Sequence, residues 1–108
     1  MSASLPRESS AAVDATVRLR DALARHGIAA DVHGGHGPAL AAVCAGLVVW
    51  SDGDRFWWCT GWDTRRRRFV YAFHRASEPE QAAQRVAFHH SRLRQRLARP
   101  ERRPESAP

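Results

Sequence analysis

The residues of this 108-residue chain that could bind a metal ion are six histidines, two cysteines and scattered carboxylates. His33 and His36 are three residues apart, and Cys44 and Cys59 are expected on the same face of one sheet. A structural zinc site usually combines two closely spaced ligand pairs, and the sequence offers no second pair of this kind. We therefore predict neither a metal site nor a cofactor.

The groups that an enzyme would need are not gathered in any recognisable motif. Asp52, Asp54 and Asp63 lie in stretches where turns use aspartate to bond their own backbone. His89 and His90 fall within an amphipathic stretch, where a half-buried histidine is the simpler interpretation. The sequence contains no glycine-rich phosphate loop and no serine elbow. We predict that the protein is not an enzyme.

All four tryptophans lie in one segment, WSDGDRFWWCTGW, from Trp50 to Trp62. Within it, Asp52-Gly53 separates two β-rich runs, a pattern typical of a two-residue hairpin turn. Such a turn places Trp50 opposite Arg55 and, because side chains alternate along a strand, assigns each residue to one face of the sheet. The face expected to pack against helices carries Val43, Leu47, Val49, Phe56, Trp58 and Trp62. The opposite face carries Cys44, Val48, Trp50, Arg55, Trp57 and Cys59.

Trp50, Arg55 and Trp57 are therefore our candidate partner-binding residues, for a protein partner or for a second copy of the chain. Two other interpretations stay open. The side chains can form a purely structural cross-strand cluster, or they can hold a small ligand.

The 17 basic residues are all arginines, and the formal net charge is +6. A complete lack of lysine and asparagine is typical of a GC-rich genome, so part of this charge can be compositional. Two groups nevertheless define an alternative nucleic-acid-binding site, in which a stripe on one helix acts with a basic loop. The stripe comprises Arg85, Arg92, Arg96 and Arg99, and the loop comprises Arg65, Arg66, Arg67 and Arg68.

The order of elements indicates an α+β domain: a helix, a three- to four-stranded antiparallel sheet and a second helix, with both helices on one face. We expect a flexible N-terminus over residues 1–9, a single domain over 10–98 and a disordered tail over 99–108. The first helix is expected from about Ser10 to His26, with Gly27 after its end. The remaining elements are expected at Ala29–His33, Leu40–Ser51, Asp54–Trp62, Arg68–His74 and Glu78–Leu97.

Cysteines without a signal peptide predict a cytoplasmic protein, and the longest apolar run is too short to cross a membrane. Four stretches, GIAADVH, GLVVWSDGDRFWWCTGW, FVYAFH and EPEQAAQRVA, resemble short uncharacterised proteins of GC-rich actinobacteria. The resemblance covers about residues 19–93. It implies a bacterial cytoplasmic setting and an accessory role in a regulatory system, and it assigns no activity.

Overall fold

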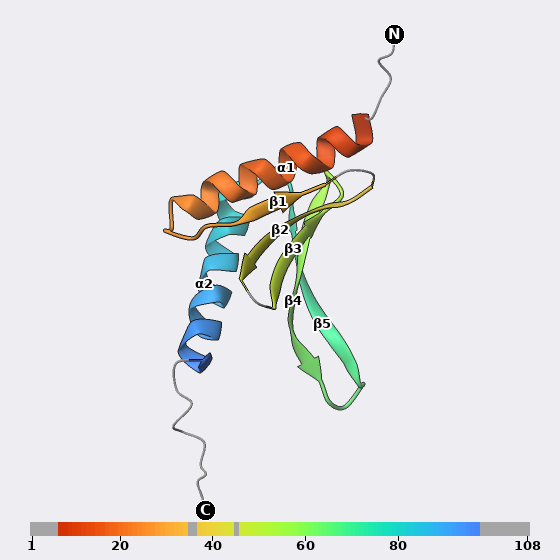
Figure 1. The fold of residues 1–108 in the computed structure, drawn as a ribbon. Helices are drawn as coiled ribbons and strands as arrows, with labels where there is room; N and C mark the ends of the chain where they lie inside the picture. Colours follow the sequence, from red (N-terminus) through yellow and green to blue (C-terminus); the bar gives the residue numbers. More distant parts are fainter. Residues whose placement is uncertain (1–6, 35–36, 45, 98–108) are drawn as a thin grey trace, which may run out of the picture.

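A computed structural model describes residues 7–34, 37–44 and 46–97 (Figure 1). The chain forms two helices and a five-stranded antiparallel sheet whose strands are neighbours in sequence order. The elements are α1 (Arg7–Ala24), β1 (Asp31–His33), β2 (Ala39–Cys44), β3 (Leu47–Ser51), β4 (Arg55–Asp63), β5 (Arg68–Arg75) and α2 (Pro79–Leu97). The expected α+β class is confirmed. The expected tail over 99–108 lies outside the described residues.

Helix α1 begins at Arg7, three residues before the expected start. It ends as its sequence predicts, because Gly27 adopts a φ of 75°, a value that favours glycine. The N–H of Gly27 donates to the carbonyl of Ala24, and that of Ile28 donates to the carbonyl of Leu23. These two bonds satisfy carbonyls that the end of a helix otherwise leaves without partners.

The expectation of three to four strands is wrong, because the run Leu40–Ser51 is two strands rather than one. The chain reverses between β2 and β3, where Gly46 has a φ of 83°. Apolar residues flank this turn on both sides, so the sequence around it resembles one continuous buried strand. Gly46 was the sole local signal of the turn.

The hairpin between β3 and β4 has a longer loop than the expected two-residue turn. Ser51 lies opposite Phe56, and Trp50 lies opposite Trp57. The Asp52 carboxylate accepts hydrogen bonds from the backbone N–H groups of Asp54 and Arg55, at 2.9 and 3.0 Å, and this holds the wider loop. The pairing therefore differs from the expected one by two residues. A shift of two residues leaves the side chains next to the turn, among them Trp50, Arg55 and Trp57, on their expected face.

A β-bulge in β4 changes the face of one tryptophan. Cys59 lies opposite Tyr71 and Gly61 lies opposite Val70, so Thr60 is an extra residue with no counterpart on β5. Past the bulge the alternation is inverted, and Trp62 lies opposite Phe69 with 51% of its surface exposed. The prediction that Trp62 belongs to the core is wrong for this reason.

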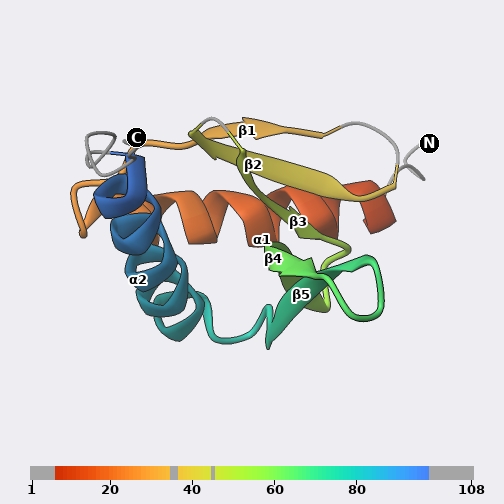
Figure 2. The same cartoon turned by 90° about the horizontal axis from the view of Figure 1, so that it is seen from below.

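Both helices contribute to one core with the same face of the sheet. Figure 2 shows the sheet curving around α1, with α2 beside it. The largest buried side chains are Phe56 and Trp58 from β4, together with Leu19 and Leu23 from α1. An ion pair between Arg25 and Glu80 joins the end of α1 to the start of α2. The core residues are Ala15, Leu19, Ala22, Leu23, Ile28, Leu47, Val49, Phe56, Trp58, Ala76, Ala82, Ala83 and Val86.

None of the helices in the described part of the chain has the length and apolar character needed to cross a membrane.

Candidate binding face

The sheet face opposite the helices gathers most of the aromatic side chains of the protein. The chain has nine Trp, Tyr and Phe residues, of which Phe56 and Trp58 are buried in the core and Phe88 lies on α2. The other six lie on neighbouring strands β3, β4 and β5, at positions that alternate with the core-facing ones. We call this surface the outer aromatic face; it comprises Trp50, Trp57, Trp62, Phe69, Tyr71 and Phe73.

The three predicted partner-binding residues lie together at one end of the outer aromatic face. Trp50 and Trp57 are directly opposite each other on β3 and β4. The Trp57 ring lies 6.5 Å from the Phe73 ring, centroid to centroid, with an interplanar angle of 32°. The Arg55 guanidinium carbon lies 5.3 Å from the centroid of the same Phe73 ring. Phe73 therefore joins the predicted residues into one cluster.

The other end of the face is built on the long hairpin of β4 and β5. The Trp62 and Phe69 rings meet edge to face, with centroids 4.9 Å apart and an interplanar angle of 72°. Tyr71 lies between Phe69 and Phe73 on the same side of β5, because side chains two apart share a face. Aromatic positions therefore continue along this side of the hairpin from Phe73 to Phe69.

These rings are largely open to solvent. Exposed fractions run from 38% for Trp50 to 61% for Phe69, with Phe73, Tyr71 and Trp62 between them. Taking roughly 200 Å² per aromatic side chain, these five expose about 500 Å² together. That is near the upper end for the largest apolar patch of a monomer, a size that often marks a contact site.

Sequence reasoning missed four of the six members of the outer aromatic face. Phe69, Tyr71 and Phe73 alternate along β5, and that alternation was the available signal for a shared face. Whether these three side chains share a face with Trp57 depends on the register between β4 and β5, and the sequence does not determine that register. Trp62 joins them only because of the bulge at Thr60.

The arginines of the alternative nucleic-acid site come from two different elements. Arg65, Arg66 and Arg67 lie at the tip of the β4–β5 hairpin, and Arg68 begins β5. The Asp63 carboxylate holds this tip by accepting the backbone N–H groups of Arg65 and Arg66, at 3.0 and 3.3 Å. Arg85, Arg92 and Arg96 lie on α2, and Arg99 lies outside the described residues.

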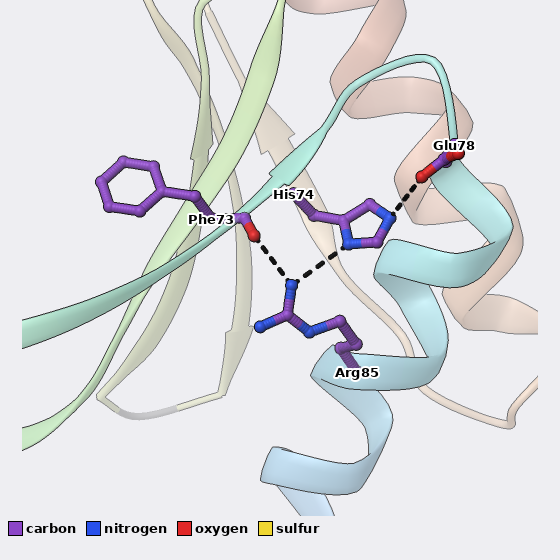
Figure 3. Close-up of polar contacts among 4 residues, drawn as sticks. All are labelled: Phe73, His74, Glu78 and Arg85. Carbon is purple, nitrogen blue, oxygen red and sulfur yellow. Dashed lines mark hydrogen bonds and ion pairs between the residues drawn. The ribbon is translucent and has the colours of Figure 1, made fainter.

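The Arg85 side chain reaches from α2 toward β5 and bonds the edge of the sheet (Figure 3). Its Nη1 donates to the carbonyl of Phe73 at 2.7 Å and to Nδ1 of His74 at 3.1 Å. Because a guanidinium can only donate, Nδ1 accepts, and Nε2 of His74 carries the proton that it donates to Oε1 of Glu78 at 2.9 Å. The guanidinium carbon also lies 5.2 Å from the Trp58 ring centroid. This arrangement connects α2 to β5.

Within the described residues, no three His, Cys, Asp or Glu side chains lie close enough together to hold a metal ion. His36, one of the histidines considered above, is outside that part of the chain. Cys44 is exposed and Cys59 is half-buried.

Comparison of the chain with protein-family models, curated proteins and solved structures found no match.

Proposed function

We propose that the protein is a non-catalytic binding module whose outer aromatic face docks a partner protein. The observation that supports this is the concentration of six aromatic side chains on the one sheet face that no helix covers. Tryptophan, tyrosine and arginine are the residues that dominate binding energy at protein interfaces. The exposed aromatic area of about 500 Å² is more than half of the roughly 800 Å² that each partner contributes to a standard interface.

The charges around the face indicate the chemistry of the partner. Arg55 lies opposite Arg75 at one end of the face, and the arginines of the hairpin tip lie at the other. By strand alternation, none of the outward-facing positions described on β3, β4 and β5 is a carboxylate. A partner with an apolar centre and an acidic rim is therefore complementary. A second copy would bring two chains of charge +6 together, which opposes a homodimer.

Single-stranded nucleic acid is the second candidate, and the proximity of Arg55 to the Trp57–Phe73 pair favours it. Exposed rings on a sheet can stack bases, while arginines contact the phosphates. This form of the hypothesis uses the outer aromatic face instead of the helix stripe, because Arg85 is already engaged by β5.

Position-resolved cross-linking in the organism that encodes the protein tests the proposal. A photoreactive phenylalanine replaces Tyr71 on the outer aromatic face or, as a matched exposed control, Phe88 on α2. We expect one discrete protein adduct from position 71 that is absent from position 88. An adduct of twice 12.1 kDa would identify a second copy and refute the acidic partner, and no protein adduct at position 71 would refute docking by this face.

Binding by the purified components then confirms the contact. Trp50→Ser and Trp57→Ser should each weaken binding of the cross-linked protein by at least about tenfold, since hot-spot truncations cost 2 kcal/mol or more. A twelve-nucleotide oligothymidylate provides the second arm. If it binds instead, with a slope of about −1.4 in log K against log salt for contacts from Arg55 and Arg75, the nucleic-acid candidate replaces the first.

A further inference from the structure

A groove separates α2 from the inner side of the β4–β5 hairpin, on the opposite face of the sheet from the outer aromatic face. In Figure 1, α2 and the β4–β5 hairpin extend from the core in the same direction. The first half of α2 is held in the core through Ala82, Ala83 and Val86, while in the second half Leu93 packs against the core and is only partly buried. Further along α2, a groove of about 470 Å³ lies between the helix and the sheet. That volume is within the usual range for small-molecule sites.

One side of this groove is apolar and aromatic. Trp58 and Ala72 line it from the sheet, and Phe88 and Leu93 line it from α2. Phe88 is 65% exposed, more than any other large apolar side chain in the described part of the chain. A large ring left open beside a half-buried leucine offers a surface on which a flat apolar group can pack.

The other side of the groove is basic. Arg92 and Arg96 are one helical turn apart, and both line it together with Arg85 and His89. Among the described residues, no carboxylate lines the groove and neither Arg92 nor Arg96 has an ion-pair partner. Burial, together with the charges of Arg96 and Arg92, lowers the pKa of His89. A pocket with positive charge and no acid is complementary to an anion.

We propose that this groove binds a small amphipathic anion, whose flat apolar body packs on Phe88 and Leu93 and whose carboxylate or phosphate contacts Arg92 and Arg96. The Arg92 guanidinium carbon lies 5.7 Å from the Phe88 ring centroid, so the charged and apolar parts of the site adjoin. Arginine suits both head groups because its planar guanidinium can donate two parallel hydrogen bonds to either. Arg85 also lines the groove, and it is held there by its hydrogen bonds to Phe73 and His74.

Three probes with one apolar body test the two halves of this site: 2-naphthoate, 2-naphthyl phosphate and the neutral 2-naphthol. Titration calorimetry of the full chain should show binding of at least one anion about tenfold or more tighter than 2-naphthol. The better anion identifies the preferred head group. Equal affinity for all three, or no binding of either anion, would overturn the proposal.

Matched variants locate the binding. Arg92→Gln combined with Arg96→Gln should weaken the better anion by at least about tenfold, and Phe88→Ser should weaken both anions and 2-naphthol. Arg94→Gln changes an exposed arginine of α2 that does not line this groove, and Trp50→Ser changes the outer aromatic face. Both controls should bind as the unchanged chain does. If either control weakens binding as much as the groove variants do, the assignment of the site is refuted.

A second readout is independent of the variants. A bound anion should raise the pKa of His89, followed by the ring proton signals of that histidine in NMR spectra, because a nearby negative charge favours imidazolium. An unchanged titration of His89 at saturating anion would contradict binding in the groove.

Discussion

Truncation of Trp58 and of Trp62, one at a time, tests the β-bulge on which the composition of the outer aromatic face depends. Without the bulge, simple alternation along β4 would put both tryptophans in the core. With it, Trp58 is 2% exposed and Trp62 is 51% exposed. The two Trp→Ala substitutions remove the same atoms, so the difference in their cost reports the difference in burial.

The expected costs follow from the buried areas. Trp58 buries nearly all of roughly 200 Å², which at 25 cal/mol per Å² corresponds to about 5 kcal/mol. Measured truncations of buried tryptophan fall at about 3–5 kcal/mol. Trp62 buries half as much area, so Trp62→Ala should cost at most about 2.5 kcal/mol. Trp58→Ala should therefore cost about twice as much free energy of unfolding as Trp62→Ala.

Urea unfolding followed by far-ultraviolet circular dichroism measures both costs, with the dependence on denaturant checked to be equal. A domain of this size has about 5–15 kcal/mol of stability in total, so Trp58→Ala can leave too little folded protein to measure. Trp58→Phe against Trp62→Phe then gives the same comparison at lower cost. If the Trp62 variant loses as much stability as the Trp58 variant, Trp62 is a core residue and the bulge at Thr60 is refuted.

Three further predictions concern turns and titrating groups. Gly53→Ala should destabilise the protein more than Gly46→Ala in urea unfolding. Both glycines have a positive φ, which costs another residue about 1–2 kcal/mol, but only at Gly53 would the added Cβ also lie 3.1 Å from Cβ of Ala11. Equal costs for the two substitutions would contradict this close approach. Burial raises the pKa of Asp52, but the backbone hydrogen bonds outweigh it and hold this pKa below 3.8. The wild-type chain should therefore have a larger free energy of unfolding than Asp52→Asn above pH 3.8, and this difference should disappear as pH falls through the lowered pKa. A difference in urea titrations that does not depend on pH would argue against this. Burial and the charges of Arg96 and Arg92 hold the pKa of His89 below 6.5, so below pH 6.5 unfolding takes up a proton and the free energy of unfolding declines. Arg96→Gln should raise the pKa of His89 in NMR titrations and reduce this decline. An unchanged pKa would exclude the electrostatic explanation.

The sequence was sufficient for the elements whose signals are local. The amphipathic patterns of α1 and α2, the glycine that ends α1 and the apolar alternation around Phe56 and Trp58 each predicted the observed element. The pairing of β3 with β4 differs from the expected one by two residues, and an even shift does not change which face of the sheet a side chain lies on.

The features that the sequence did not predict depend on a single residue or on pairing between strands. The turn at Gly46 interrupts an apolar run without any polar residue beside it, so the run reads as one strand. The bulge at Thr60 inverts the alternation within β4, and periodicity alone assumes that no such inversion occurs. The groove was not predictable, because it depends on how far α2 lies from β5. Spacing placed Arg92 and Arg96 on one side of α2, but it did not place Phe88 beside them in a groove facing the hairpin.

The position of β5 at the end of the sheet has a consequence for how the protein avoids aggregation. An edge strand has backbone groups without a neighbouring strand, and one rich in aromatic residues can recruit a second molecule by edge-to-edge pairing. Arg85 already donates a hydrogen bond to the Phe73 carbonyl on that edge, so this carbonyl is not open to a backbone N–H of an incoming strand. Arg68 and Arg75 lie at the two ends of β5, where antiparallel pairing of two such edges would bring like charges together. We therefore expect these arginines to oppose edge-to-edge pairing of β5 between molecules, and their removal to favour it.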